Sequence, residues 1–124
     1  MSMKEIAEEC IFCEIVEGKI PSPRVYEDDQ FICIKDIQPQ AKIHLLLIPK
    51  KHFRSLAEAF PQQGEQQTAL VGKMMEVSAK IAWQEKLLPA GYRTVINTGE
   101  GGGQTVGHLH MHLLGGGYLH AHFA

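Results

Sequence analysis

Residues 108–114 have the order His-Leu-His-Met-His-Leu-Leu, in which histidine and apolar residues alternate strictly from 108 to 113. Side chains of a β-strand point alternately to the two faces of its sheet, so this segment is predicted to place three imidazoles on one face. The opposite face carries Leu109, Met111 and Leu113, which we expect to pack on a hydrophobic core. The alternation predicts a strand over residues 106–114, with one apolar side and one imidazole side.

Further elements follow from hydrophobic spacing and from turn-forming residues. Four short apolar runs predict strands over residues 24–27, 31–35, 43–48 and 92–97. A helical stripe predicts a long helix from about residue 65 to about residue 86, through Leu70, Met74, Val77 and Ile81. A short helix is expected over residues 11–17, and a flexible loop over residues 99–103. Together these elements indicate the α+β class, with a mostly antiparallel five-stranded sheet, one long helix and one short N-terminal helix.

Length and composition argue against several classes of protein. The chain has 124 residues, of which 44% are apolar and 21% charged, as expected for one globular domain that buries its own core. Its net charge is −2 and neither half is basic, so we expect no nucleic acid as a partner. No apolar run is long enough to span a membrane, and residues 1–9 lack an apolar signal segment. We therefore expect a cytoplasmic protein.

Histidine is concentrated at one end of the sequence. Residues 101–124 contain five of the seven histidines and no Asp, Glu, Lys or Arg, which is typical of a site rather than of a solvated tail. A neutral imidazole can attack phosphorus through one nitrogen, and a neighbouring histidine can protonate the leaving group. The glycine run at residues 101–103 can turn main-chain N–H groups towards an anion. The alternatives are a solvated histidine face or histidines bonded to neighbouring strands, and, for the glycine run, a plain flexible connection.

The histidine segment also has the motif of a known family. Histidine, apolar, histidine, apolar, histidine and two apolar residues are the pattern of the histidine triad (HIT) family, which the chain resembles from about Cys10 to Gly116. Further matching segments are Ile20-Pro21, Tyr26-Glu27-Asp28, Asp36-Ile37-x-Pro39-Gln40-Ala41, His44-x4-Pro49-Lys50-Lys51-His52, Gly91-Tyr92-Arg93, Asn97 and Gly102-Gly103-Gln104. The combination is most similar to the branch of histidine triad nucleotide-binding proteins. We expect a single HIT domain over residues 1–124, with a core at 10–116, an N-terminal extension at 1–9 and a C-terminal tail at 117–124.

The resemblance implies an enzyme that binds purine nucleoside monophosphates of the AMP or GMP type and hydrolyses nucleoside phosphoramidates. In this interpretation His110 is the nucleophile and forms a nucleotidyl-histidine intermediate. His112 contacts the phosphate, and His44 lies near both from a neighbouring strand. The phosphate and leaving-group site is assigned to Asn97, Gly103, Gln104 and Thr105. No metal is expected to be required for catalysis.

The resemblance also assigns the rest of the nucleotide site. Asp36 would accept hydrogen bonds from the ribose hydroxyls, which suits a carboxylate, although aspartate at this point also suits a turn. Thr105 replaces a serine that is frequent in relatives, and Gly107 replaces a bulky aromatic residue, so the wall of the site is predicted to be open there. The apolar slot for the base is assigned to Ile11, Phe12, Ile15, Ile37 and Leu46, with core packing as the alternative for the first three.

A metal site is a separate prediction. Cys10 and Cys13 have the spacing of two thiolate ligands, and tetrahedral zinc needs two more donors. An odd count of three cysteines argues against a disulfide framework, and Cys33 is expected in the core. The resemblance to bacterial HIT proteins completes the ligand set with His52 and His108, which implies a structural zinc ion. Buried free thiols and a redox pair without metal are the alternatives.

Two other functions compete with hydrolysis at this stage. A metalloenzyme would use His108, His110 and His112 as ligands, and a nucleotide-binding partner protein would bind without turnover. We interpret His120 and His122 as tail residues rather than ligands. The family also implies a homodimer in which the long helix and the strand at 92–97 meet their symmetry mates, so that the sheet continues across the two-fold axis.

Overall fold

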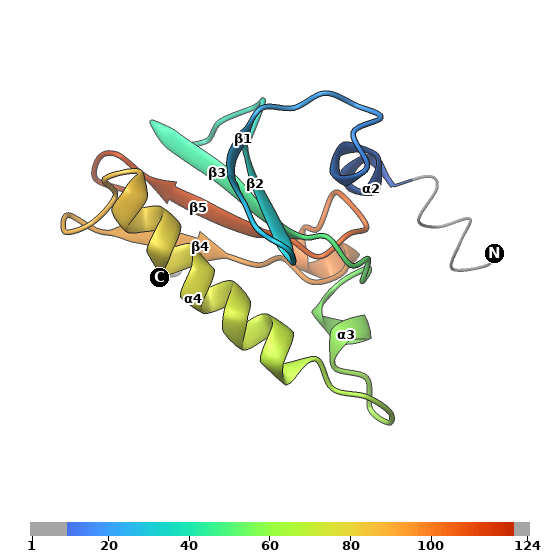
Figure 1. Ribbon diagram of the computed structural model, residues 1–124. Coiled ribbons are helices and arrows are strands. Elements are labelled where there is room, and N and C mark those ends of the chain that lie inside the picture. Colours follow the sequence, from blue (N-terminus) through green and yellow to red (C-terminus); the bar gives the residue numbers. More distant parts are fainter. Residues whose placement is uncertain (1–9, 121–124) are drawn as a thin grey trace.

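The computed structural model describes residues 10–120, whose elements are arranged as in Figure 1. A short helix α2 (Ile11–Val16) precedes a hairpin of β1 (Arg24–Glu27) and β2 (Phe31–Lys35). The strand β3 (Ile43–Pro49) is followed by helices α3 (Leu56–Ala59) and α4 (Thr68–Gln84). Strand β4 (Tyr92–Val95), the 3-10 turn η1 (Glu100–Gly102) and strand β5 (Met111–Gly115) complete the fold. The expected extension at residues 1–9 and the tail residue His122 lie outside the described residues.

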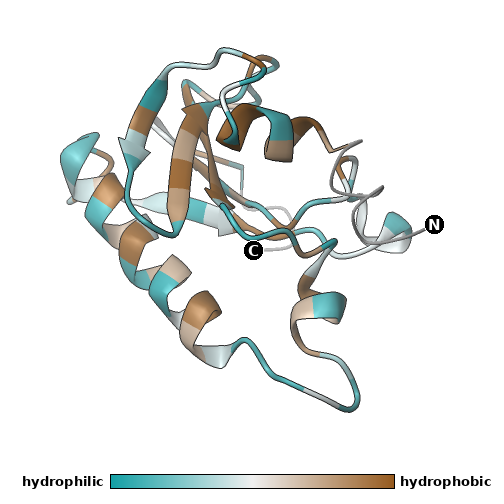
Figure 2. Cartoon of the chain, turned by 45° about the vertical axis from the view of Figure 1, so that its right-hand side comes forward, coloured by the Kyte–Doolittle hydropathy of each residue, from teal (hydrophilic) through white to brown (hydrophobic). Residues whose placement is uncertain are grey.

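The five strands form one antiparallel sheet in the order β1-β2-β3-β5-β4, which confirms the predicted α+β architecture. Because strand side chains alternate, the sheet buries apolar residues on both faces, and Figure 2 shows them in brown along its central strands and α2. The face packed against α4 carries Phe31, Cys33, Leu45, Leu47, Leu109, Met111 and Leu113. The face packed against α2 carries Ile32, Ile34, Leu46 and Ile48.

The long helix α4 confirms the predicted apolar stripe but is shorter than expected. Met74, Val77 and Ile81 are buried on the sheet. The helix covers residues 68–84 instead of about 65–86. It ends where Lys86 adopts a left-handed φ of 61°, which a continuing helix cannot accommodate. No helix within residues 10–120 has both the length and the apolar character needed to cross a membrane.

Helix α3 was not predicted from the sequence. It has only four residues, which is about one turn and too short to show an apolar periodicity. Its start is fixed by Ser55, whose hydroxyl accepts a hydrogen bond from the N–H of Ala57. The helix matters for the site because residues 52–54, which lead into it, contact the histidine segment.

Strand β5 begins at Met111, so the strand predicted over residues 106–114 is only partly formed. The register between β3 and β5 places Leu47 opposite Met111, which leaves Ile48 and Pro49 to continue the pairing. Proline has no N–H to donate, so the hydrogen-bond ladder stops there. Residues 106–110, including two of the three histidines, therefore lie beyond the ladder and depend on other contacts. Strand β4 likewise ends at Val95 rather than at residue 97.

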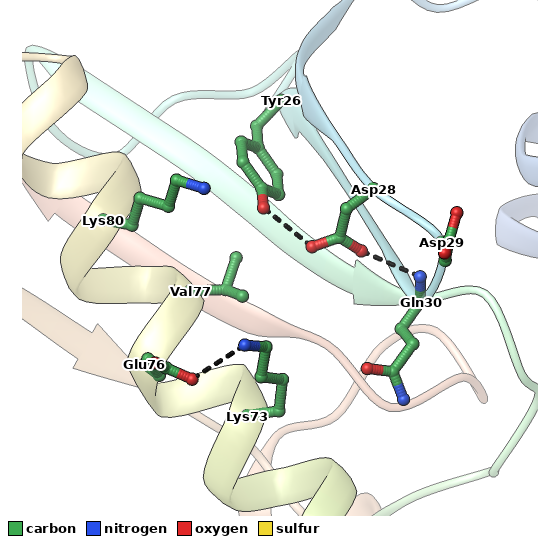
Figure 3. A pocket seen from close by; sticks show the side chains of 8 residues that line it. All are labelled: Tyr26, Asp28, Asp29, Gln30, Lys73, Glu76, Val77 and Lys80. Carbon is green, nitrogen blue, oxygen red and sulfur yellow. Dashed lines mark hydrogen bonds and ion pairs between the residues drawn. The ribbon is translucent and has the colours of Figure 1, made fainter.

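A polar hollow of about 520 Å³ opens between α4 and the turn that joins β1 to β2 (Figure 3). At its rim the Asp28 carboxylate accepts hydrogen bonds from the Tyr26 hydroxyl at 2.7 Å and from the N–H groups of Gln30 and Phe31 at 2.8 Å each. Burial raises the pKa of Asp28, but these hydrogen bonds and the Lys50 charge lower it further, so the net shift is downwards. The eight residues that line the hollow include no histidine or cysteine, so this hollow is distinct from the histidine segment.

Candidate active site and metal cluster

The segment between the glycine loop and β5 is held by residues 52–54, which follow β3 in the sequence. The contacts join His52 Nδ1 to His108 Nδ1 (3.0 Å), the Phe53 carbonyl to the Leu109 N–H (2.7 Å) and the Arg54 carbonyl to the Gln104 side-chain amide (2.6 Å). These contacts take the place of a strand ladder. The histidines are therefore positioned by a loop on one side and by β5 on the other.

His110 is buried, and its hydrogen bonding leaves one ring nitrogen unprotonated. Its Nδ1 lies 2.7 Å from the main-chain carbonyl oxygen of His108, which can only accept, so Nδ1 carries the proton. The neutral ring then has its lone pair on Nε2. Burial lowers the pKa of His110, while the His108 carbonyl and the Asp36 charge act in the opposite direction. The lowered pKa keeps the ring neutral, which is the state that a nucleophile needs.

His44 and His112 form a directed hydrogen-bond chain. The main-chain N–H of Gln40 donates to His44 Nδ1 at 2.9 Å, so in the neutral ring the proton of His44 is on Nε2. His44 Nε2 lies 2.9 Å from His112 Nδ1 and donates to it, which places the His112 proton on Nε2. The Nε2–H of His112 is thus left over by the hydrogen-bond chain that runs from Gln40 through His44 to His112. Burial, followed by the neighbouring His110 and His44 rings, lowers the pKa of His112 to about 4.

Asp36 lies next to this chain. One carboxylate oxygen is 3.4 Å from His44 Nε2, and the other accepts the N–H of Gln38 at 2.8 Å in the turn between β2 and β3. The turn-forming alternative for Asp36 is therefore realised in the structure. Its predicted contact with ribose hydroxyls stays a prediction.

The glycine loop closes mainly on itself. The N–H of Gly102 and the N–H of Gln104 both bond to the Gly99 carbonyl at 3.1 Å, and the N–H of Gly103 bonds to the Glu100 carbonyl at 3.0 Å. The side chain of Asn97 donates to the Gly102 carbonyl at 2.8 Å. An anion cradle would therefore need N–H groups other than these three. Thr105, which follows the loop, is exposed.

The residues predicted for the base slot separate into two groups. Phe12, Ile15 and Leu46 are buried in the apolar cluster beneath α2. Ile11 is 47% exposed and Ile37 is 95% exposed. The ring of Phe12 meets the rings of His108 and His110 edge-on, with centroid distances of 5.9 and 5.1 Å. Phe12 thus brings α2 against the candidate nucleophile, whichever residues contact a base.

The predicted metal ligands Cys10, Cys13, His52 and His108 come together in the structure. Their four donor atoms lie within 4.8 Å of one another. His108 Nδ1 is 3.2 and 3.5 Å from the two sulfur atoms of Cys10 and Cys13, and His52 Nδ1 is 3.2 Å from that of Cys13. With Zn–S near ~2.3 Å and Zn–N near ~2.0 Å, tetrahedral ligand atoms lie roughly 3.3–3.8 Å apart. The three sulfur–nitrogen separations agree with a tetrahedral ion to within a few tenths of an ångström.

The protonation of the cluster also suits a metal. His108 Nε2 lies 2.8 Å from the Pro49 carbonyl and donates to it, which leaves the His108 Nδ1 lone pair facing the sulfur atoms. Burial, and next the adjacent Cys10, raises the pKa of the Cys13 thiol to about 12. Burial is also the main cause that lowers the pKa of His108 to about 4. A bound cation would compensate for the cost of a buried thiolate.

Comparisons with known proteins place this arrangement in a family. A family model described as "Scavenger mRNA decapping enzyme C-term binding" matches residues 9–121. A HIT family hydrolase from Legionella pneumophila has a crystal structure with a TM-score of 0.83 and 40% identity, over 91% of this chain and 97% of that one. This chain belongs to the histidine triad family. The resemblance predicted from the histidine motif is confirmed, and the protein is a HIT-family hydrolase.

Two further HIT relatives bear on the reaction and on the metal. The purine nucleoside phosphoramidase of Escherichia coli K12 is 46% identical over 111 residues, which are 90% of each chain. A zinc-bound histidine triad family protein from Mycobacterium smegmatis is 36% identical, with a TM-score of 0.75 over 88% of this chain and 76% of that one.

The sequence patterns did not predict the main-chain groups that form hydrogen bonds with the histidine rings. The carbonyls of Pro49 and His108 and the N–H of Gln40 decide which nitrogen of each histidine is protonated. Pro49 lies 59 residues before His108, so no local pattern connects the two. The only local signal was Pro49 itself, which marks the end of β3.

Proposed function

We propose that this protein is a purine nucleoside phosphoramidase that works through a covalent nucleotidyl-histidine intermediate on His110. The observation that carries this proposal is the fixed tautomer of His110, which presents an unprotonated Nε2 in a buried site. The 46% identity to the E. coli phosphoramidase supports the substrate class.

The proposed reaction has two displacements at phosphorus. First, the Nε2 lone pair of His110 attacks the α-phosphorus, and the phosphorus–nitrogen bond breaks with its electron pair leaving on the amine, which takes up a proton from solvent. Then water attacks the same phosphorus and gives a proton back to solvent, the bond to Nε2 breaks with its electron pair returning to the imidazole, and the nucleoside monophosphate leaves. The His108 carbonyl accepts from Nδ1–H throughout and stabilises the positive charge that the ring gains in the first step.

The remaining histidines have supporting roles in this proposal. The free Nε2–H of His112 donates to a phosphate oxygen, and His44 holds that tautomer through the hydrogen bond to His112 Nδ1. The hydroxyl of Thr105 contacts the phosphate or the leaving group, beside Asn97 and Gly103. Asp36 accepts from the ribose hydroxyls. The base lies against the apolar cluster beneath α2.

The Cys/His cluster holds structural zinc in this proposal, with Cys10, Cys13, His52 and His108 as the four ligands. Zinc supplies a cross-link and no reaction chemistry. Cys10 is the N-cap of α2 and Cys13 lies in its first turn, while His108 precedes the nucleophile by two residues. The ion would therefore tie α2 to the segment that carries His110, and would withhold His108 from catalysis.

We also infer a homodimer. Met75 and Trp83, which are 48% and 60% exposed, lie on the surface of α4, away from its buried stripe. Strand β4 is at an edge of the sheet, where a second copy would pair with unsatisfied main-chain groups. Sedimentation of Trp83→Glu would test this: a wild-type dimer and a variant monomer are expected. A wild-type monomer at micromolar concentration contradicts the inference.

Turnover of adenosine 5′-phosphoramidate tests the proposed function. The wild-type protein is expected to release AMP, and an early quench in alkaline denaturant, which preserves a phosphorus–nitrogen bond, should show a nucleotidyl adduct on the peptide that contains His110. His110→Ala should lose both signals, whereas the matched control His120→Ala, a change in the exposed tail, should keep them.

Each other outcome has a defined meaning. Tight AMP binding without turnover would favour a nucleotide-binding partner protein. Stoichiometric metal bound through His110 would favour a metalloenzyme. A wild-type protein that neither binds AMP nor turns over the phosphoramidate would overturn the proposal.

A further inference from the structure

The side chain of Gln104 joins three separate parts of the main chain. Its Oε1 accepts the N–H of Gly99 at 2.8 Å. Its Nε2 donates to the Arg54 carbonyl at 2.6 Å and to the Val106 carbonyl at 2.8 Å. The residues that it joins are the start of the glycine loop, the entry to α3 and the start of the histidine segment.

These hydrogen bonds lie in a part of the chain that is outside the hydrogen-bond ladder of the sheet. The β3–β5 ladder ends before residue 110, so residues 104–110 have no strand partner. The segment is fixed at its far end by the Leu109 N–H, which donates to the Phe53 carbonyl. At the other end of the segment, the Gln104 side chain donates to the carbonyl of Arg54, which is the residue after Phe53. Thr105 lies between these two attachments.

Resting on the proposed phosphoramidase activity, we propose that Gln104 is a positioning residue, which fixes Thr105 and the histidine segment through the main chain and does not itself bind the phosphate. An amide nitrogen has two hydrogens, and both are used by the carbonyls of Arg54 and Val106. A phosphate bond from Nε2 would require one of them to break and leave a carbonyl without its donor.

Two substitutions separate the bonds of Gln104. Gln104→Glu keeps an oxygen for the Gly99 N–H but faces both carbonyls with an acceptor instead of a donor. Gln104→Met removes all three bonds at similar length. The matched control is Gln66→Glu, because Gln66 Nε2 also donates to two main-chain carbonyls, those of Pro61 and Gly64, in the loop before α4.

Steady-state kinetics with adenosine 5′-phosphoramidate are the main measurement, with thermal unfolding alongside to show that each variant is folded. Misplacement of reacting groups lowers the chemical step, so both Gln104 variants should lose about 10–100-fold in kcat while KM changes less than about threefold. Gln66→Glu should keep the wild-type kcat. A merely structural role would lower the melting temperature of a Gln104 variant without changing kcat below that temperature.

A crystal structure of the wild-type protein with AMP gives a second test that needs no variant. The expected result is that Gln104 Nε2 remains on the Arg54 and Val106 carbonyls. Gln104 Nε2 bonded to the phosphate, an unchanged kcat in folded Gln104→Glu, or a rise in KM alone would each overturn the inference. A wild-type protein without turnover would instead overturn the proposed function first, and the inference with it.

Discussion

Two pairs of histidines in this molecule have similar distances between their ring nitrogens. They differ in the main-chain group that forms a hydrogen bond with the outer nitrogen of one ring. His52 and His108 approach to 3.0 Å between ring nitrogens, and His44 and His112 approach to 2.9 Å. Each pair has further donor atoms within 4.8 Å, two cysteines for the first and Asp36 for the second. By the distances between donor atoms alone, both sets can hold a metal ion.

The partner of the far ring nitrogen distinguishes His108 in the first pair from His44 in the second, whereas His52 Nε2 is buried without a hydrogen-bond partner. His108 donates from Nε2 to the Pro49 carbonyl, so its Nδ1 lone pair is free for an ion. His44 accepts on Nδ1 from the Gln40 N–H, so its Nε2 keeps a proton and points it at His112. A carbonyl behind the ring thus leaves the near nitrogen with a lone pair that suits a metal ion, and an N–H behind the ring leaves the near nitrogen as a hydrogen-bond donor. The comparison teaches that the outer partner, more than the spacing of the ligands, decides what a histidine does.

Removal of zinc should have the largest effect on stability. It should affect only the Cys/His cluster, which contains the pair His52 and His108. We expect protein purified without added zinc to contain one ion per chain. A ligand of the folded state stabilises it by about 4 kcal/mol when its free concentration is about a thousand times Kd. Unfolding in denaturant, with and without a strong chelator, measures this difference. The alternatives of free thiols or a redox pair gain support if the metal content is zero and the chelator changes nothing.

His44→Asn should have the next largest effect, and on turnover instead of metal content. The change removes the group that holds the His112 tautomer, and the loss of one positioned donor to the charge of the transition state typically costs about 100-fold or more in kcat. Zinc content measured on the same sample should stay at one ion per chain. The matched change His52→Asn should instead lower the zinc content below one ion per chain. If His44→Asn also released the ion, the separation of the two pairs would be wrong.

Much of this arrangement was predictable from the sequence, but the separation of the two pairs was not. Alternation and spacing gave the five strands, the α4 stripe and the side of the histidine segment that packs on the core, because these depend on local periodicity. The start of β5 was wrong by five residues, since it depends on Pro49 in a different strand. The cysteine spacing supplied Cys10 and Cys13 of the Cys/His cluster, and the family resemblance supplied His52 and His108. Neither pattern contains main-chain donors and acceptors, and these set the tautomers of His44, His108 and His110.

The same dependence on the partner predicts a pH effect at Asp28, which belongs to neither pair. Asp28 accepts three hydrogen bonds and has a lowered pKa in the folded state. A lowered pKa contributes stability that is present above the unfolded pKa, near ~3.9, and is lost as pH falls through the folded value. Asp28→Asn should cost about 1–2 kcal/mol at pH 7, as expected for hydrogen bonds to a charged group. Its stability should then fall less steeply than that of the wild type below about pH 4. Denaturant unfolding between pH 2 and pH 7 measures both, and parallel curves would contradict the assignment.

The smallest expected effect tests the comparison most directly, because the change removes the N–H group that acts as the outer partner. Gln40→Pro removes the N–H that donates to His44 Nδ1, whereas the control Gln40→Ala keeps it. A lost hydrogen bond of this kind costs about 1 kcal/mol, so the variant should stay folded. Without the donor, His44 can carry its proton on Nδ1 and offer Nε2 as a ligand beside His112 and Asp36. We expect Gln40→Pro to bind a second zinc ion and to lose turnover when zinc is added, and Gln40→Ala to do neither. A second ion bound equally by both variants would show that the N–H of residue 40 does not decide the role of His44.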